Sequence, residues 1–272
     1  MDPTPLLISS LQNPRIKHAI RLRQRSHRDT ENRMLIEGYR ELKRALDNHH
    51  IPLEVFFCTE LFQGANEPAL LEQCRQAGAT LTACSPPVFE KLAYRERPEG
   101  LLAVAPQVRH ALESLVLPPD ALLIVAEAIE KPGNLGTILR SADAAGAHAV
   151  LVCDRCTDLN NPNVVRASIG TLFSIPVVEA SGDDTLAWLR RNAIRTVAAT
   201  PHTDRLYTEA DMTGPVAIIL GTEQYGLSER WMKQTDCQVR IPMRGQADSL
   251  NVAAAATILL FEAVRQRMAR PA

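Results

Sequence analysis

Three short segments of this 272-residue chain place polar side chains and glycines directly after an apolar run, where they could hold a ligand. The first has the sequence EKPGNLGTILRS, at residues 130–141. Gly133 and Gly136 would allow a tight strand-to-helix turn with a close backbone approach to a ligand. Arg140 would lie about one and a half turns into a helix that begins near Asn134, pointing back to the strand end where open α/β sheets bind ligands. A loop with incidental glycines and a surface arginine explains this segment equally well.

The second segment, LGTEQYGLS at residues 220–228, is another apolar run that leads straight into a glycine-bearing turn. Glu223 would stand in that turn, beside backbone that can approach a ligand. An acidic residue in such a place is also common at the start of a helix, where the helix dipole stabilises its charge. The segment alone therefore leaves both a catalytic and a structural role open.

The third segment, VRIPMRGQADSLNVA at residues 239–253, predicts a strand halted by Pro242, a loop and a long alanine-rich helix. Asp248 and Ser249 are good candidates to cap that helix. Ser249 and Asn251 place two polar side chains where the apolar stretch begins. A capped core helix would not explain Asn251, because that residue stands inside the apolar stretch.

An α/β framework must position these segments. Continuous apolar runs separated by helical stretches are typical of strands buried on both faces of a mostly parallel sheet, and five of them follow residue 120. Shorter strand-like runs alternate with helical ones in the first third of the chain. We predict an α/β protein with a first domain at residues 1–106, a proline-bearing linker at 107–120 and a second domain at 121–272. The expected strands lie at 34–38, 53–58, 79–83, 101–105, 121–126, 149–153, 175–178, 196–199 and 216–220.

Several classes of protein are disfavoured by what the chain lacks. No G-x-G-x-x-G follows a strand, and neither a P-loop motif nor G-x-S-x-G is present. The histidines and cysteines form no set with metal-ligand spacing, so no metal is expected; Cys153 ends an apolar run and is expected to be a buried strand residue. No apolar run is long enough to span a membrane and the start, MDPTPLLISS, lacks a signal-peptide pattern, so we expect a cytoplasmic protein.

A net charge of -1 means that any surface for nucleic acid must be local. One basic stretch, residues 15–28, contains no acidic residue and could contact RNA phosphates in a salt-sensitive way. A solvated helix face is the alternative. The candidate RNA-binding residues are Arg15, Lys17, Arg21, Arg23, Arg25 and Arg28.

Taken together and in order, the three segments resemble the signatures of the SpoU/TrmH family of RNA 2′-O-ribose methyltransferases, within the SPOUT superfamily. The matching strings are N-L-G-T-I-L-R-S-A, G-T-E-x-x-G-L-S and I-P-M-x-G-x-x-x-S-L-N-V-A, and the match extends over residues 121–268. The first domain is similar to the substrate-binding domain of many members through residues 35–38 and 98–104. One departure is Gln224, where many members have glycine; a positive φ there would disfavour glutamine. Thr222 is a conservative variant of a small polar position.

The resemblance implies a ribosomal-protein-like α/β domain that binds RNA, followed by a parallel-sheet SPOUT domain with a deep trefoil knot. It also implies a homodimer in which the partner chain completes each active site. The methyl donor, S-adenosylmethionine, would lie in the knot and be held largely by backbone groups. The residues implied to bind it are Thr200, Pro201, Leu220, Gly221, Gly226, Ile241, Met243, Ser249 and Leu250.

The same resemblance assigns Arg140 to the ribose 2′-hydroxyl. A guanidinium, whose pKa is above about 12, is a poor base, so we expect Arg140 to clamp a nearby phosphate and polarise the hydroxyl. The catalytic set is completed by residues that would orient Arg140 and the ribose: Asn134, Glu223, Ser249 and Asn251.

A large first domain and no basic tail after Met268 favour ribosomal RNA over transfer RNA as the substrate, and no DNA is expected. Three alternatives remain at this point. They are a transfer-RNA 2′-O-methyltransferase, a methyltransferase that acts on a base, and a non-catalytic RNA-binding protein that keeps the fold.

Overall fold

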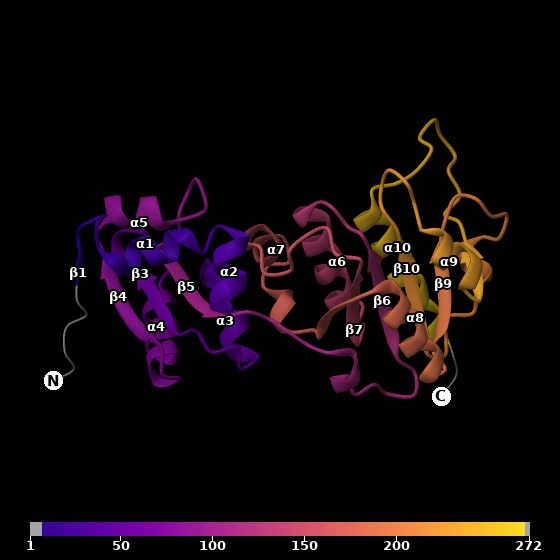
Figure 1. Cartoon of the computed structure of the whole chain (residues 1–272), viewed down its shortest axis with the longest axis horizontal. Helices are drawn as coiled ribbons and strands as arrows, with labels where there is room; N and C mark the ends of the chain where they lie inside the picture. Colours follow the sequence, from indigo (N-terminus) through magenta and orange to yellow (C-terminus); the bar gives the residue numbers. More distant parts are fainter. Residues whose placement is uncertain (1–6, 270–272) are drawn as a thin grey trace. The chain divides into compact units, whose positions relative to one another are not determined.

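The computed structural model describes residues 7–269 and divides the chain into two compact units (Figure 1). Unit 1 consists of Met1–Val108 together with Asp158–Ser174, and unit 2 of Arg109–Thr157 together with Ile175–Ala272. Residues 1–6, which carry part of the start where no signal peptide is expected, lie outside the described residues, as do residues 270–272.

Unit 1 contains a five-stranded mixed sheet with the order β1-β4-β3-β5-β2. Strands β1 and β3 each pair with β4 in parallel, whereas β5 pairs antiparallel with both β2 and β3. All four strands predicted for the first domain are confirmed, and only the two-residue β1 was not expected. The strands are β1 (Leu7–Ile8), β2 (Arg33–Glu37), β3 (Glu54–Phe57), β4 (Thr80–Cys84) and β5 (Leu101–Pro106).

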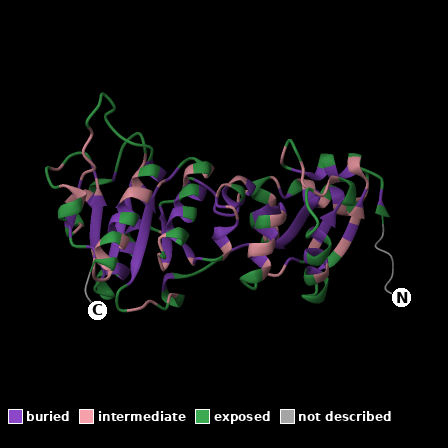
Figure 2. Cartoon of the chain, turned by 180° about the vertical axis from the view of Figure 1, so that it is seen from behind, coloured by how far each residue is buried: buried purple, intermediate pink, exposed green. Residues whose placement is uncertain are grey.

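Helices pack on this sheet around a core in which Phe56, Phe89 and Leu35 are fully or almost fully buried. Figure 2 shows that buried residues are concentrated in the strands, with exposed residues on the outer helix faces. The helices are α1 (Pro14–Arg21), α2 (Arg25–Glu31), α3 (Tyr39–Asp47), α4 (Glu67–Gln76), α5 (Pro86–Leu92) and α7 (Pro162–Ala167), with the 3-10 turns η1 (Thr59–Leu61) and η3 (Thr171–Phe173).

Unit 2 is built on a six-stranded sheet with the order β11-β9-β10-β6-β7-β8. Every neighbouring pair of its strands is parallel, as predicted from the apolar runs. The carboxyl ends of all six strands therefore lie at one edge of the sheet. The strands are β6 (Leu122–Glu127), β7 (Ala149–Cys153), β8 (Val177–Ala180), β9 (Arg195–Ala199), β10 (Val216–Leu220) and β11 (Cys237–Val239).

The helices α6 and α10 of unit 2 pack against each other, and the hydroxyl groups of Ser141 and Thr257 are hydrogen-bonded across them at 2.7 Å.

Among residues 7–269, no helix is long and apolar enough to cross a membrane. The helices of unit 2 are α6 (Pro132–Ala144), α8 (Gly182–Arg191), α9 (Glu229–Gln234) and α10 (Val252–Met268), with the 3-10 turns η2 (Leu112–Ser114) and η4 (Tyr207–Glu209).

The compact units differ from the predicted domain boundaries at two places. Residues 158–174, which connect β7 to β8, pack in unit 1 although their neighbours on both sides belong to unit 2. We call this stretch the inserted segment. The expected linker is also structured, because it contains η2 and because His110 forms a parallel bridge with Val178 of β8.

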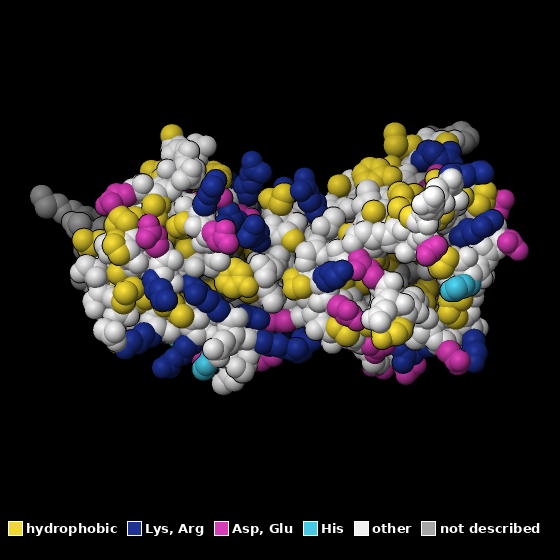
Figure 3. All heavy atoms as spheres, turned by 90° about the horizontal axis from the view of Figure 1, so that it is seen from above, with side chains coloured by type: hydrophobic (Ala, Val, Ile, Leu, Met, Phe, Trp, Pro, Cys, Tyr) yellow, Lys and Arg dark blue, Asp and Glu magenta, His cyan; other side chains and the backbone are white. Residues whose placement is uncertain are grey.

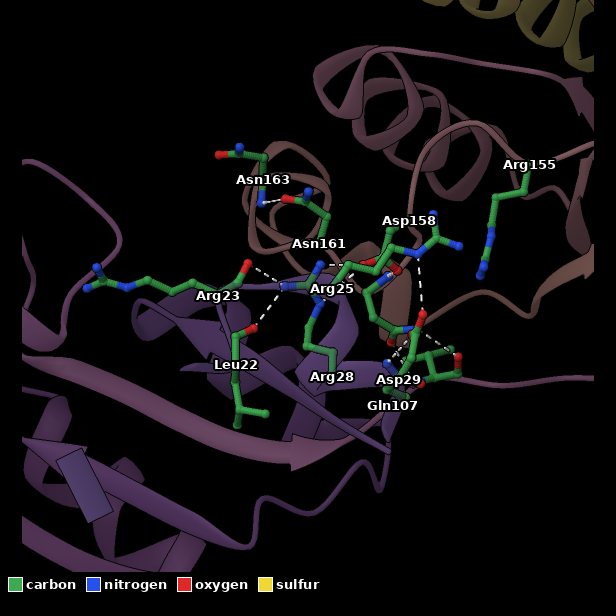
Figure 4. A network of polar contacts seen from close by, with 12 residues as sticks. Leu22, Arg23, Arg25, Arg28, Asp29, Gln107, Arg155, Asp158, Asn161 and Asn163 are labelled. Carbon is green, nitrogen blue, oxygen red and sulfur yellow. Dashed lines mark hydrogen bonds and ion pairs between the residues drawn. The ribbon is translucent and has the colours of Figure 1, made fainter. Parts of the chain in front are cut away.

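A buried ion pair attaches the inserted segment to the rest of unit 1. Arg28 is only 1% exposed, and its Nε and Nη2 atoms donate to one carboxylate oxygen of Asp158, with an Nε-to-oxygen distance of 3.1 Å. Its Nη1 donates to the carbonyl oxygens of Leu22 and Arg23 at 2.8 and 2.7 Å (Figure 4). The prediction that Arg28 contacts RNA is therefore wrong, because the guanidinium is buried and its donors are already used.

Because removal of one member of a buried ion pair leaves an uncompensated charge, Arg28→Met should destabilise unit 1 by about 3–5 kcal/mol. Urea unfolding followed by circular dichroism measures this loss. Arg25→Met is the matched control, since Arg25 forms an exposed pair with Asp29 that should contribute less than about 1 kcal/mol. A loss below about 1 kcal/mol for Arg28→Met would contradict the assigned role.

Candidate active site

The three polar segments of the sequence meet at the carboxyl edge of the unit 2 sheet. The first begins after β6, the second follows β10 and the third follows β11. Strands β6 and β10 are direct neighbours, so the first two segments leave the sheet side by side. The third segment returns to them through α10, which packs on α6.

The side chain of Glu223 joins all three segments. Its Oε1 atom accepts hydrogen bonds from Asn134 Nδ2 at 2.8 Å and from Asn251 Nδ2 at 2.6 Å. Asn251 Nδ2 also lies 3.1 Å from Asn134 Oδ1. The other carboxylate oxygen, Oε2, forms an ion pair with Lys131 Nζ at 2.6 Å. We call these four residues the Glu223 network. Three of them, Lys131, Asn134 and Glu223, line a small pocket together with Ile129, Glu130, Thr222 and Val252.

The charges of the network stabilise one another. The hydrogen bond from Lys131 lowers the pKa of the Glu223 carboxyl below its ordinary value, and the bond from Asn134 acts in the same direction. The same contact raises the pKa of Lys131. Glu223 is therefore an anion at neutral pH and functions as a hydrogen-bond acceptor.

Glycines shape the turn that carries Glu223. A Cβ at Gly221 would lie 2.3 Å from the carbonyl carbon of Gly226, so the two backbone stretches approach too closely for any side chain. Thr222 and Gly226 exchange two backbone hydrogen bonds at 3.0 and 3.1 Å. The positive φ of this turn, 69°, falls on Gly226 and not on Gln224. The concern that glutamine is strained at position 224 is therefore wrong.

Two of the predicted catalytic residues lie outside the network. Arg140 is exposed on α6, and roughly 120° of helix rotation separates it from Asn134. Ser249 is exposed in the loop before α10. Neither side chain has a hydrogen bond or ion pair to any residue within 7–269. The structure thus brings together Asn134, Glu223 and Asn251, but not Arg140 or Ser249.

Sequence reasoning missed Lys131, the only cation of the network. Its position three residues before Asn134 could have indicated it, because residues three apart share one face of a helix turn. The amide of Ser228, at the far end of the Glu223 turn, is also fixed by a group that was not predicted. It donates to the buried carboxylate of Glu127 at 2.9 Å.

The residues predicted to hold the donor lie at the ends of strands or in the loops that follow them, at the same sheet edge. Thr200 is buried after β9, where its amide donates to the carbonyl of Val239 at 2.9 Å. The others range from the buried Leu220 at the end of β10 to Leu250, which is 39% exposed. Of the remainder, Ile241 and Met243 are half-buried, Gly221 and Gly226 shape the turn after β10, and Pro201 and Ser249 are exposed.

No group of three or more metal-ligating side chains is found in the part of the chain that the structure describes. Cys153 is a buried strand residue, as predicted, and burial raises the pKa of its thiol to about 12.

The basic stretch at residues 15–28 is divided between structural and exposed side chains. Arg23 Nη2 donates to the carbonyl oxygens of Lys91 and Ala93 at 2.6 and 2.7 Å. Arg15 is paired with Glu54 at the sheet surface, and Arg28 is buried. The exposed basic side chains of the stretch are those of Lys17, Arg21 and Arg25.

Comparison with known proteins identifies both parts of the chain. The model of the SpoU rRNA Methylase family matches residues 121–261, and the model of the MRM3-like substrate binding domain matches residues 13–103. The chain is 35% identical over 256 residues to the 23S rRNA (uridine(2479)-2'-O)-methyltransferase of Streptomyces viridochromogenes. That match covers 91% of this chain and 88% of its relative.

Solved structures resemble the whole chain. One, an RNA 2'-O ribose methyltransferase, is 45% identical with a TM-score of 0.83, over 97% of this chain and 100% of that one. Another is the SpoU methyltransferase AviRb from Streptomyces viridochromogenes in complex with the cofactor AdoMet. It is 32% identical with a TM-score of 0.84, over 95% of this chain and 100% of that one.

The close approach at Gly221 can be tested by adding one methyl group. Gly221→Ala should lower the free energy of unfolding of unit 2 by about 2 kcal/mol or more, because the backbone of the turn must move apart. Thermal unfolding measures the effect. Gly214→Ala is the control, since a Cβ at Gly214 meets no atom within 4 Å. Equal stability of the two variants would show that the turn is not packed as described.

Proposed function

Because the chain belongs to the SpoU rRNA methylase family, we propose that it transfers a methyl group from S-adenosylmethionine to a ribose 2′-hydroxyl of ribosomal RNA. The observation that carries this proposal is the Glu223 network, in which the three family segments form one site. The substrate named for the relative from Streptomyces viridochromogenes, 23S rRNA, supports ribosomal over transfer RNA. A ribosomal RNA substrate supports the expectation of a cytoplasmic protein.

The loops around the Glu223 network fit the proposed donor. Ile241, Met243 and Leu250 offer half-buried or exposed apolar side chains that suit an adenosine ring. Backbone groups of Thr200 and Gly221 lie at the same sheet edge and can bind the polar atoms of the donor. When bound, the donor supplies a methyl group on a sulfonium sulfur.

The chain's own residues position and polarise the reactants. During transfer the carbon–sulfur bond breaks as the bond to the ribose 2′-oxygen forms, and the hydroxyl proton is released to water. Arg140 is not the base in this proposal, because a guanidinium is a poor base. It holds an RNA phosphate and polarises the 2′-hydroxyl, while Asn134, Glu223 and Asn251 keep the ribose in line with the donor.

The place of Arg140 supports a homodimer in which Arg140 of the partner subunit completes each site. Within the described residues, Arg140 forms no hydrogen bond or ion pair with the Glu223 network of its own chain, and it is exposed on α6. The adjoining helix α10 presents exposed apolar side chains on one helix face, with Phe261 46% and Met268 81% exposed. Large apolar side chains on one helix face are typical of a surface that a partner covers.

Two features of the architecture belong to the same proposal. The C-terminal part of unit 2 is threaded as a trefoil knot; this is supported by the sheet order, in which β9, β10 and β11 lie on the opposite side of β6 from β7 and β8. Unit 1 is a ribosomal-protein-like domain that binds the RNA, supported by the match of residues 13–103 to a substrate binding domain. We place residues 1–106 and the inserted segment in this RNA-binding domain, and 121–157 with 175–272 in the methyltransferase domain, joined at 107–120.

Loss of Arg140 tests the proposed chemistry. Arg140→Ala should bind S-adenosylmethionine with unchanged affinity in calorimetric titration, because the network and the loops stay intact. Methylation of a 23S rRNA transcript should fall by about 10²–10³-fold, the typical effect of losing one group that stabilises charge in the transition state. Arg191→Ala on α8, which also removes an exposed arginine, is the control and should be fully active. Full activity of Arg140→Ala would exclude the assignment.

A further inference from the structure

The loop between α5 and β5 in unit 1 holds an exposed aromatic side chain in a fixed place. Tyr94 is 38% exposed, although the backbone around it is tightly bound. The buried carboxylate of Glu37 accepts hydrogen bonds from the amides of Tyr94, at 2.8 Å, and Arg95, at 3.3 Å. On the preceding side, Arg23 binds the carbonyl oxygen of Ala93 at 2.7 Å.

The side chain of Arg95 also holds this loop in place. Its Nη2 atom donates to the carbonyl of Glu37 at 3.0 Å and to the carboxylate of Glu41 at 2.7 Å, and its Nη1 atom pairs with Glu99. The carboxyl groups of Glu37 and Glu41 are both buried. Buried charges are costly to maintain, so a set of them that holds one surface loop indicates that the loop's conformation matters.

The inserted segment supplies part of the surface around Tyr94. Asn163 of α7 donates from Nδ2 to the Tyr94 hydroxyl oxygen at 3.1 Å. Arg166, three residues further along α7, is exposed, as are Arg97 of the loop and Arg40 at the start of α3. The guanidinium groups of these three arginines have no hydrogen bond or ion pair within the described part of the chain. Lys and Arg side chains are numerous on unit 1 in Figure 3.

We propose that Tyr94, with Asn163 and Arg166 of the inserted segment and Arg97 of its own loop, forms a platform on which an unpaired base of the RNA substrate stacks. An exposed aromatic ring, with unpaired arginines on the same loop and on the helix that contacts it, fits single-stranded RNA, whose bases stack while its phosphates meet the arginines. Duplex RNA has its bases already stacked and offers none to Tyr94. The inference rests on the proposed function, because it names the surface that receives the substrate.

The platform is tested with the full-length protein and a single-stranded oligouridylate of about twelve nucleotides that contains one 2-aminopurine. Tyr94→Ala should weaken binding on the order of tenfold at fixed salt and abolish the fluorescence quenching that stacking causes. Tyr94→Phe keeps the ring and should bind within about twofold of the unchanged protein. Tyr94→Leu retains apolar packing without a ring, so its binding should be weakened on the same order as expected for Tyr94→Ala. This second variant keeps the test valid if Tyr94→Ala does not fold.

Salt dependence separates stacking from phosphate contact. Arg166→Ala should reduce the slope of log affinity against log salt by about one, whereas Tyr94→Ala should leave this slope unchanged. Arg191→Ala on α8 is the matched control and should change neither quantity. If the unchanged protein binds and methylates RNA but the Tyr94 variants bind equally well, the platform is excluded and the proposed function stands. If the unchanged protein binds no RNA even at low salt, the proposed function itself fails.

Discussion

The contact on which unit 2 depends is the pair of hydrogen bonds from two asparagines to the carboxylate of Glu223. Asn134 lies in the first turn of α6, and Asn251 caps α10. The amino ends of both helices carry partial positive charge, which favours an anion between them. A single carboxylate thereby fixes the starting points of two packed helices, and with them the loops that surround the site.

This contact exists only because the sheet is parallel and its order places β10 beside β6, although three other strands lie between them in the sequence. Glu223 is 89 residues from Asn134 and 28 from Asn251. The side-by-side placement of β6 and β10 brings the first two together, and the packing of α10 on α6 brings in the third. Arg140 is placed by the same helix α6 but on another face, so the proposed set of functional groups is complete only in the proposed homodimer.

Much of this arrangement could be predicted from the sequence, because its signals are local. The apolar runs located nine strands, and Asn251 was noticed as a polar residue that a core helix did not need. The inserted segment could not be predicted, since its main attachment joins Arg28 to Asp158 across 130 residues. From sequence alone Arg28 has the pattern of a surface cation. Gln224 was misjudged for a related reason: the turn's positive φ depends on the return of the backbone at Gly226.

We propose that the Glu223 network of one subunit works with Arg140 of the partner subunit. Coexpression of Arg140→Ala with Glu223→Ala tests it most directly, since each variant alone is expected to lose nearly all activity. Half of the dimers formed at random are mixed, and each of these contains one intact site, so methylation of 23S rRNA should return to roughly a quarter of the unsubstituted level. Activity of the mixture no higher than that of either variant would contradict the claim.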